Sequence, residues 1–105
     1  MYDEFLNKAK SSLEKDVLKL IRQAGIKLPK EMHRIITKNG EPIAEADLFY
    51  DHNICVFVDG PDHDKDYVIK DDEIKRSKLK KLGYKVVVVH HKDIASGIEN
   101  IKGSI

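Results

Sequence analysis

The chain has 105 residues and a formal net charge of +1 at pH 7, so bulk charge identifies no class of partner. This length suits one domain with a single core. The hydrophobic content excludes disorder, and no apolar stretch approaches the roughly 18 residues needed to cross a bilayer. One cysteine, Cys55, excludes disulfides within the chain. The N-terminus lacks the pattern of a secretory signal, so we expect a cytoplasmic protein.

The first predicted element is an amphipathic helix over residues 11–24, SSLEKDVLKLIRQA, with Gly25 as its C-cap. The apolar residues of 5–9 either extend it or form a separate turn. Ser11 and Glu14 have the spacing of a capping box, in which the glutamate reaches back to a backbone N–H. Glu14 therefore has a structural interpretation besides any catalytic one.

Three antiparallel strands are predicted next. Residues 32–38 are rich in β-formers and end at Asn39-Gly40, a strong signal for a tight hairpin turn. The chain should return as a strand over 42–50, turn at 51–53 and run again over 54–59. We therefore expect a three-stranded meander after the first helix.

The second half predicts a helix over 71–82, with acids in its first turn and Gly83 after its end. Residues 84–89 include four consecutive valines, which favours a strand buried on both faces inside the sheet. The tail, 92–105, has isoleucines at roughly helical spacing. The α-β-β-β-α-β order predicts an α/β domain, with a mixed sheet of about four strands flanked by helices.

Charge is unevenly distributed along the second half. Residues 59–73 hold seven acids and two lysines, whereas 75–85 hold six basic residues and no acid. A nuclease needs such a division, because carboxylates hold a metal ion and cations hold phosphates. Matching of charges to the helix dipole explains the same pattern equally well. The candidates for contacts to a DNA backbone are Lys75, Arg76, Lys78 and Lys80.

Strand geometry predicts a cluster of carboxylates. If Tyr50 pairs with Ile54 across the second turn, Glu45 lies opposite Asp59, and Asp47 points to the same face. Like charges facing each other across two strands are destabilising unless a cation offsets them. We therefore expect a hard divalent ion, Mg²⁺ or Mn²⁺ in its place, on Asp47 and Asp59.

The segment after the third strand, GPDHDKD, contains His63 between Asp62 and Asp64. Histidine transfers protons near neutral pH, so His63 is a candidate general acid or base. Zinc is the alternative metal, although structural zinc sites usually combine cysteine and histidine at short spacings. The other histidines, His33 among them, are expected at the surface or at strand ends.

Several segments in order resemble a known family, the very-short-patch-repair endonucleases. They are Ala46 to Tyr50, Val56 to Gly60, His63, Asp72 to Arg76, and Leu82 to Val86. That family belongs to the PD-(D/E)XK nuclease superfamily, and related domains occur in phage homing endonucleases named for an E-D-x-H-D set of residues. The resemblance covers residues 11–90 and implies a restriction-endonuclease-like core.

The resemblance also implies roles for particular residues. The family's helical glutamate falls on Glu14, its metal-binding aspartate on Asp47 and its histidine-aspartate pair on His63-Asp64. Asp59 takes the position at the strand end, where the family makes metal or water contacts. The superfamily's lysine, two residues after an acid on the third strand, is missing here, and His63 becomes the candidate general base.

We expect residues 1–105 to be a single nuclease catalytic domain, part of a longer protein. It would hydrolyse phosphodiester bonds of double-stranded DNA with Mg²⁺, in a bacterial or phage-infected cell, with a homo-oligomer possible for two-strand cleavage and no membrane partner. One alternative is a non-catalytic nucleic-acid-binding module that keeps the nuclease fold, which the missing lysine motivates. A hydrolase of small phosphoesters is another.

Overall fold

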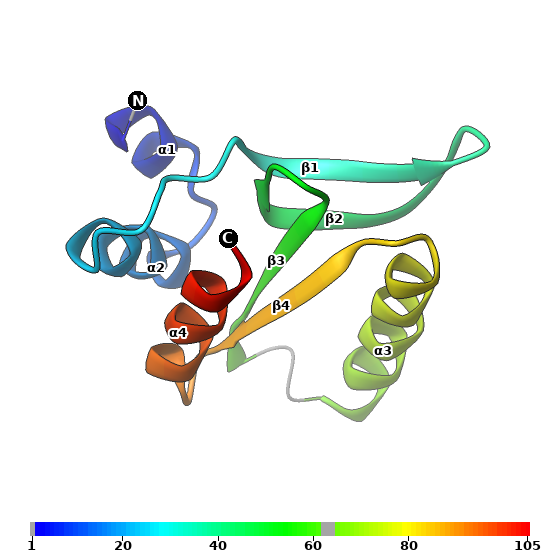
Figure 1. Ribbon diagram of the computed structural model, residues 1–105. Helices are drawn as coiled ribbons and strands as arrows, with labels where there is room; N and C mark the ends of the chain where they lie inside the picture. The colour runs from blue at the N-terminus through cyan, green and yellow to red at the C-terminus, as the bar shows by residue number, and fades with distance from the viewer. Residues whose placement is uncertain (1, 62–64) are drawn as a thin grey trace.

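The computed structural model describes residues 2–61 and 65–105, so the predicted site residues His63 and Asp64 lie outside the described part (Figure 1). The described residues form four helices and four strands. Their order is α1 (Tyr2–Lys8), α2 (Ser12–Gln23), β1 (Glu31–Lys38), β2 (Glu41–Tyr50), β3 (Ile54–Asp59), α3 (Asp66–Lys81), β4 (Lys85–His90) and α4 (Ile94–Ser104). The predicted α/β class is confirmed, and the tail does form a helix.

The four strands form one sheet in the order β1-β2-β3-β4. The first three are antiparallel, as predicted, and β4 is parallel to β3, which makes the sheet mixed. The expectation that β4 lies inside the sheet is wrong, because β4 pairs with β3 alone and forms an edge. Helices lie against both faces of the sheet, so a run of valines is as suitable at this edge as in the centre. The strand buried along its whole length is β3.

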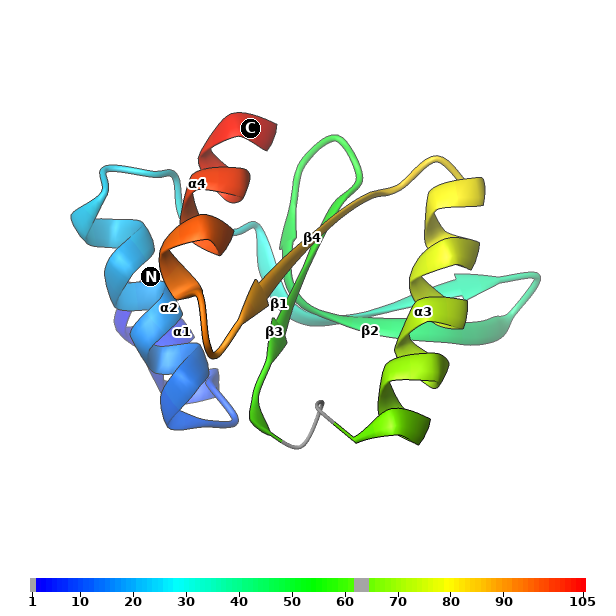
Figure 2. The same cartoon turned by 90° about the horizontal axis from the view of Figure 1, so that it is seen from below.

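The helices form two layers of unequal size. Figure 2 shows α1, α2 and α4 on one side of the sheet and α3 on the other. Side chains alternate along the strands, so Leu48 and Val56 pack toward the larger layer, while Phe49 and Phe57 pack toward Leu79 of α3. The candidate site residues come from both layers and from the strands between them.

The ends of the helices follow local chemistry. Ser11 is the N-cap of α2, and its Oγ accepts a hydrogen bond from the Glu14 N–H at 3.2 Å. The apolar residues before it form the separate helix α1. Helix α3 begins at Asp66, five residues before the predicted start, because the acid that serves its first turn is Asp66 rather than the run at 71–73.

The β1–β2 hairpin has an irregular register. Lys38 pairs with Glu41 across Asn39-Gly40, and both turn residues have positive φ, as the sequence predicts for a two-residue turn. The pairing then shifts by one residue, between Ile36 and Thr37. Pro42 lies at this irregularity, where its missing N–H breaks no regular ladder bond. The shift changes which residues of β1 and β2 face each other farther along.

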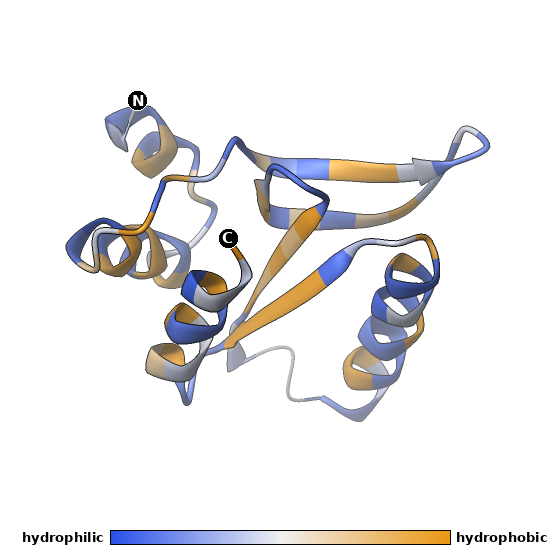
Figure 3. Ribbon diagram, in the orientation of Figure 1, coloured by the Kyte–Doolittle hydropathy of each residue, from blue (hydrophilic) through white to orange (hydrophobic). Residues whose placement is uncertain are grey.

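Helix α3 packs on the sheet through few buried apolar side chains. It has 16 residues, of which one, Leu79, is buried. Figure 3 shows the contrast between the apolar strands β3 and β4 and the largely hydrophilic α3. None of the described helices combines the length and apolar character that a bilayer crossing needs.

Candidate metal centre

The strands β2 and β3 separate at Asp47. Their pairing runs from Tyr50 and Ile54, as predicted, to Leu48 and Val56, and stops there. Beyond this point the Val58 N–H donates to the Asp47 carboxylate, at 2.7 Å, instead of to a backbone carbonyl. The carboxylate is therefore fixed in position at the opening between the two strands.

The predicted pairing of Glu45 with Asp59 is wrong, because the β2–β3 ladder ends before either residue. Glu45 pairs with Ile35 of β1, and its exposed carboxylate binds Lys10 Nζ at 3.0 Å. The two terminal nitrogens of the Arg76 guanidinium, Nη1 and Nη2, donate to the two oxygens of Asp59, at 2.9 and 2.6 Å. Both side chains of this pair are largely buried, and Asp59 is thus held by a cation of α3.

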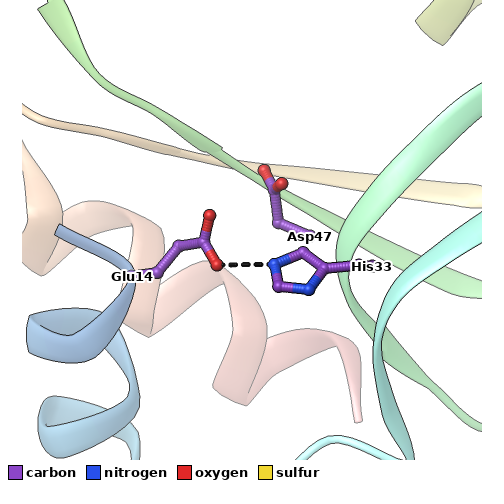
Figure 4. A group of neighbouring side chains, drawn as sticks. All are labelled: Glu14, His33 and Asp47. Atoms are coloured by element: carbon purple, nitrogen blue, oxygen red, sulfur yellow. Dashed lines mark hydrogen bonds and ion pairs between the residues drawn. The ribbon is translucent and has the colours of Figure 1, made fainter. Parts of the chain in front are cut away.

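Three side chains from three elements meet between α2 and the strands β1 and β2. Glu14 of α2, His33 of β1 and Asp47 of β2 each offer a ligand atom, and these atoms lie within 4.8 Å of one another (Figure 4). His33 Nε2 lies 2.8 Å from Glu14 Oε1. Glu14 is buried, and the other two side chains are partly buried. These residues form what we call the Glu-His-Asp cluster.

His33 reaches the cluster through an unusual backbone conformation. Its φ is 54°, a left-handed value that is uncommon for a residue other than glycine. The pairs on either side, Met32 with Leu48 and Arg34 with Ala46, place His33 across from Asp47. The other described residues of this kind, Asn39, His52 and Asn53, lie in turns, whereas His33 lies inside a strand, where a strained backbone is a reason to look for a function. The expectation that His33 is a surface or strand-end residue is wrong, since its side chain is 14% exposed and contacts Glu14.

Sequence reasoning missed His33 because of the irregular hairpin register. A regular ladder continuing from the pair Lys38–Glu41 would set His33 opposite Ala46, with the two side chains away from the acid. The one-residue shift near Pro42 sets it opposite Asp47 instead. Proline next to a hairpin turn is compatible with a bulge as well as with the start of a strand, and Pro42 was the available signal for the register shift.

Glu14 makes the predicted capping contact and also belongs to the Glu-His-Asp cluster. Its N–H donates to the Ser11 cap, and its Oε1 accepts from the Lys10 N–H at 3.3 Å. The same Oε1 contacts His33. The capping interaction therefore holds the Glu14 carboxylate in the orientation that the cluster requires.

Burial dominates the electrostatics of Asp47. It raises the pKa of this carboxyl to about 6, from an ordinary value of 3.8. The neighbouring charges of Glu14 and Asp59 also raise the pKa, whereas the Val58 N–H and His33 lower it. Near neutral pH the cluster contains a partly buried, ionised carboxylate beside a second one, and a bound cation would offset that repulsion.

A cleft of about 540 Å³ opens over Asp47 and Glu14. Its walls include the first residues of α2, the end of β3, and Lys75 and Arg76 of α3. The Arg76 Nε is buried and has no hydrogen-bond partner within the described residues. Of the four basic residues predicted to contact DNA, these two line the cleft, whereas Lys78 and Lys80 do not.

The donor set fits a divalent ion. Two carboxylates and an imidazole suit Mn²⁺, Zn²⁺ and similar ions, and the carboxylates alone would suit Mg²⁺, so the cluster is not specific to magnesium. The structure thus brings the predicted Glu14 and Asp47 together, adds His33, and pairs Asp59 with Arg76.

No protein-family model, curated protein or solved structure matches the chain.

Proposed function

We propose that the protein is a metal-dependent DNA endonuclease domain with a restriction-endonuclease-like core, as the sequence resemblance implies. The observation that carries the proposal is the Glu-His-Asp cluster, because two of its residues, Glu14 and Asp47, line the same cleft as Lys75 and Arg76. Ligands for a cation and cations for a phosphate thus lie in one cleft. Phosphodiester hydrolysis by a metal ion requires this combination.

Each residue has a proposed part in the reaction. Asp47, Glu14 and His33 would hold the ion, Mg²⁺ or Mn²⁺. When bound, a divalent ion polarises the phosphodiester and lowers the pKa of a bound water. Lys75 and Arg76, which line the cleft, would orient the phosphate, and the contact with Asp59 fixes the Arg76 guanidinium there. His63 is proposed as the proton acceptor on sequence grounds, and it lies outside the described residues.

A non-catalytic nucleic-acid-binding module is the second candidate. The observation in its favour is Asp59, whose carboxylate is engaged by Arg76 instead of facing Asp47. The lysine of the superfamily signature is also absent from the end of β3. If this candidate is right, the basic residues of α3 bind DNA, and the Glu-His-Asp cluster has no catalytic role.

Nicking of supercoiled DNA separates the two candidates. We expect nicking with Mn²⁺ or Mg²⁺, none with EDTA, and a loss of about 100-fold or more in Asp47→Ala and Glu14→Gln. Glu45→Gln is the matched control, because this acid of β2 also lines the cleft but is exposed and outside the cluster. Nicking that survives in Asp47→Ala rejects the endonuclease proposal. DNA binding at low salt without any nicking favours the second candidate.

Metal binding can be measured apart from activity. An ion that binds the folded state raises the thermal midpoint, and we expect Mn²⁺ to do so for the unaltered protein. His33→Asn removes the imidazole, and asparagine still tolerates a left-handed backbone, so Mn²⁺ affinity should fall about tenfold. His52→Asn is the matched control, since His52 also has a positive φ, 66°, but lies in an exposed turn. Equal Mn²⁺ responses in the two variants would exclude His33 as a ligand.

A further inference from the structure

Residues at the tip of the β1–β2 hairpin and residues of α3 line a second groove. Figure 2 shows the hairpin and α3, whose residues form its two walls. It has a volume of about 700 Å³. Lys38 of β1 lies on one wall, and Ile74, Lys78 and Lys81 of α3 lie on the other. Lys75 lines both this groove and the cleft over the Glu-His-Asp cluster, so the two hollows are adjacent. We call it the lysine groove.

The lysine groove is cationic. Four lysines line it against two acids, Glu41 and Asp71. Lys75 pairs with Asp71 at 2.9 Å, whereas the other three lysines form no ion pair within the described residues. Charged side chains without partners on the wall of a groove attract an anion more strongly than paired ones do.

The spacing along α3 suits a chain of phosphates. Six residues separate Lys75 from Lys81, a rise of about 9 Å along the helix. Consecutive phosphates of one DNA strand lie farther apart through space than their rise of about 3.4 Å along the duplex axis, because the strand winds around that axis, so this length reaches about two phosphates. Ile74 is 57% exposed and adds an apolar surface to the same wall of the groove. A DNA backbone can use both kinds of surface, because it has anionic phosphates and sugars with apolar carbon atoms.

We propose that the lysine groove binds the backbone of one DNA strand on one side of the scissile phosphodiester. The inference rests on the proposed function and adds the residues that would hold the DNA backbone beside the cluster: Lys38, Lys75, Lys78 and Lys81. Lysine contacts of this kind position the strand without reading its sequence. The groove thus supplies affinity next to the cluster that supplies the chemistry.

The test is binding of a fluorescein-labelled DNA duplex in EDTA, measured by anisotropy over a series of salt concentrations. We expect Lys78→Gln with Lys81→Gln to weaken binding about tenfold and to lower the slope of log affinity against log salt by about 2. The control pair is Lys19→Gln with Lys102→Gln, on exposed positions of α2 and α4 across the sheet. The control should change affinity by less than about twofold.

Equal losses in the two pairs, or no loss in either, overturn the groove inference. Lys38→Gln tests the opposite wall and should weaken binding while leaving α3 unaltered. Failure of the groove and failure of the proposed function are distinguishable. Groove-dependent binding without nicking rejects the endonuclease and keeps the groove. Nicking that needs Asp47 but is unchanged in the groove pair keeps the endonuclease and rejects the groove.

Discussion

Asp47 lies between the fully buried residues Ala46 and Leu48 and carries a carboxyl whose pKa burial raises to about 6. A carboxylate in such a position is costly unless a partner offsets it. The Val58 N–H supplies one hydrogen bond, and Glu14 adds repulsion. Residues that decrease stability in this way are expected at functional sites, where activity rather than stability selects them.

The stability of the metal-free protein should therefore depend on pH through Asp47. The pKa of Asp47 in the folded state is raised above its ordinary value. The contribution of this carboxyl to the free energy of unfolding is therefore fully present below about pH 4 and is lost as pH rises through 6. Asparagine does not ionise, so Asp47→Asn does not lose stability in this pH range. Its side-chain oxygen can still accept the hydrogen bond from the Val58 N–H. We expect it to be about 1–3 kcal/mol more stable than the unaltered protein above pH 7 and no more stable below pH 4.

Denaturant unfolding in EDTA at several pH values measures this difference. Glu45→Gln is again the control, and its difference from the unaltered protein should be small because Glu45 is exposed. Parallel pH profiles for Asp47→Asn and the unaltered protein would contradict the prediction.

At the scale of elements, local signals predicted what local chemistry determines. The Ser11 cap and Gly25 delimit α2, and Asn39-Gly40 fixes the hairpin turn. The parts that failed depend on contacts distant in sequence. The edge position of β4 depends on which strand it pairs with, and its valines suit any position between two helical layers. Sequence alone did not exclude either arrangement.

The residues of the candidate site also differ in whether local sequence signals predict them. Glu14 and Asp47 were predictable, because each has a local signal as well as the resemblance. His33 was not, because its place across from Asp47 depends on a one-residue register shift near Pro42. The partner of Asp59 is 17 residues away on α3, and strand alternation contains no information about that helix. Long-range geometry therefore decided which acids meet.

Helix α4 packs closely on β4 at Gly97. A Cβ built there would meet the Cα of Val89 at 2.8 Å, closer than real contacts allow. We expect Gly97→Ala to destabilise the fold by about 1–3 kcal/mol, despite the higher helix propensity of alanine. Gly103→Ala, in the same helix with nothing within 4 Å, should be neutral or gain up to about 1 kcal/mol. Thermal unfolding compares the two variants, and equal midpoints would show that α4 does not pack this closely.

The helices on the two faces of the sheet differ in how many apolar side chains they bury. The cations of the cleft, Lys75 and Arg76, belong to α3, the helix that buries fewer. Helix α2 buries Val17, Leu18 and Ile21, whereas α3 buries Leu79 alone. The buried Arg76–Asp59 pair adds little net stability once its desolvation is counted. Local opening needs least free energy where few apolar contacts must break. Helix α3 should therefore open more readily than α2.

Amide hydrogen exchange followed by mass spectrometry tests this asymmetry. In the metal-free protein we expect α3 peptides to exchange faster than α2 peptides, with β3 slowest because all six of its residues are buried. A DNA duplex should slow exchange in α3 more than in α4, because Lys75 and Arg76 would bind phosphate and α4 lies across the sheet. Equal protection of α2 and α3 in the free protein would show that the two layers hold the sheet equally, and the cleft would then be a rigid site.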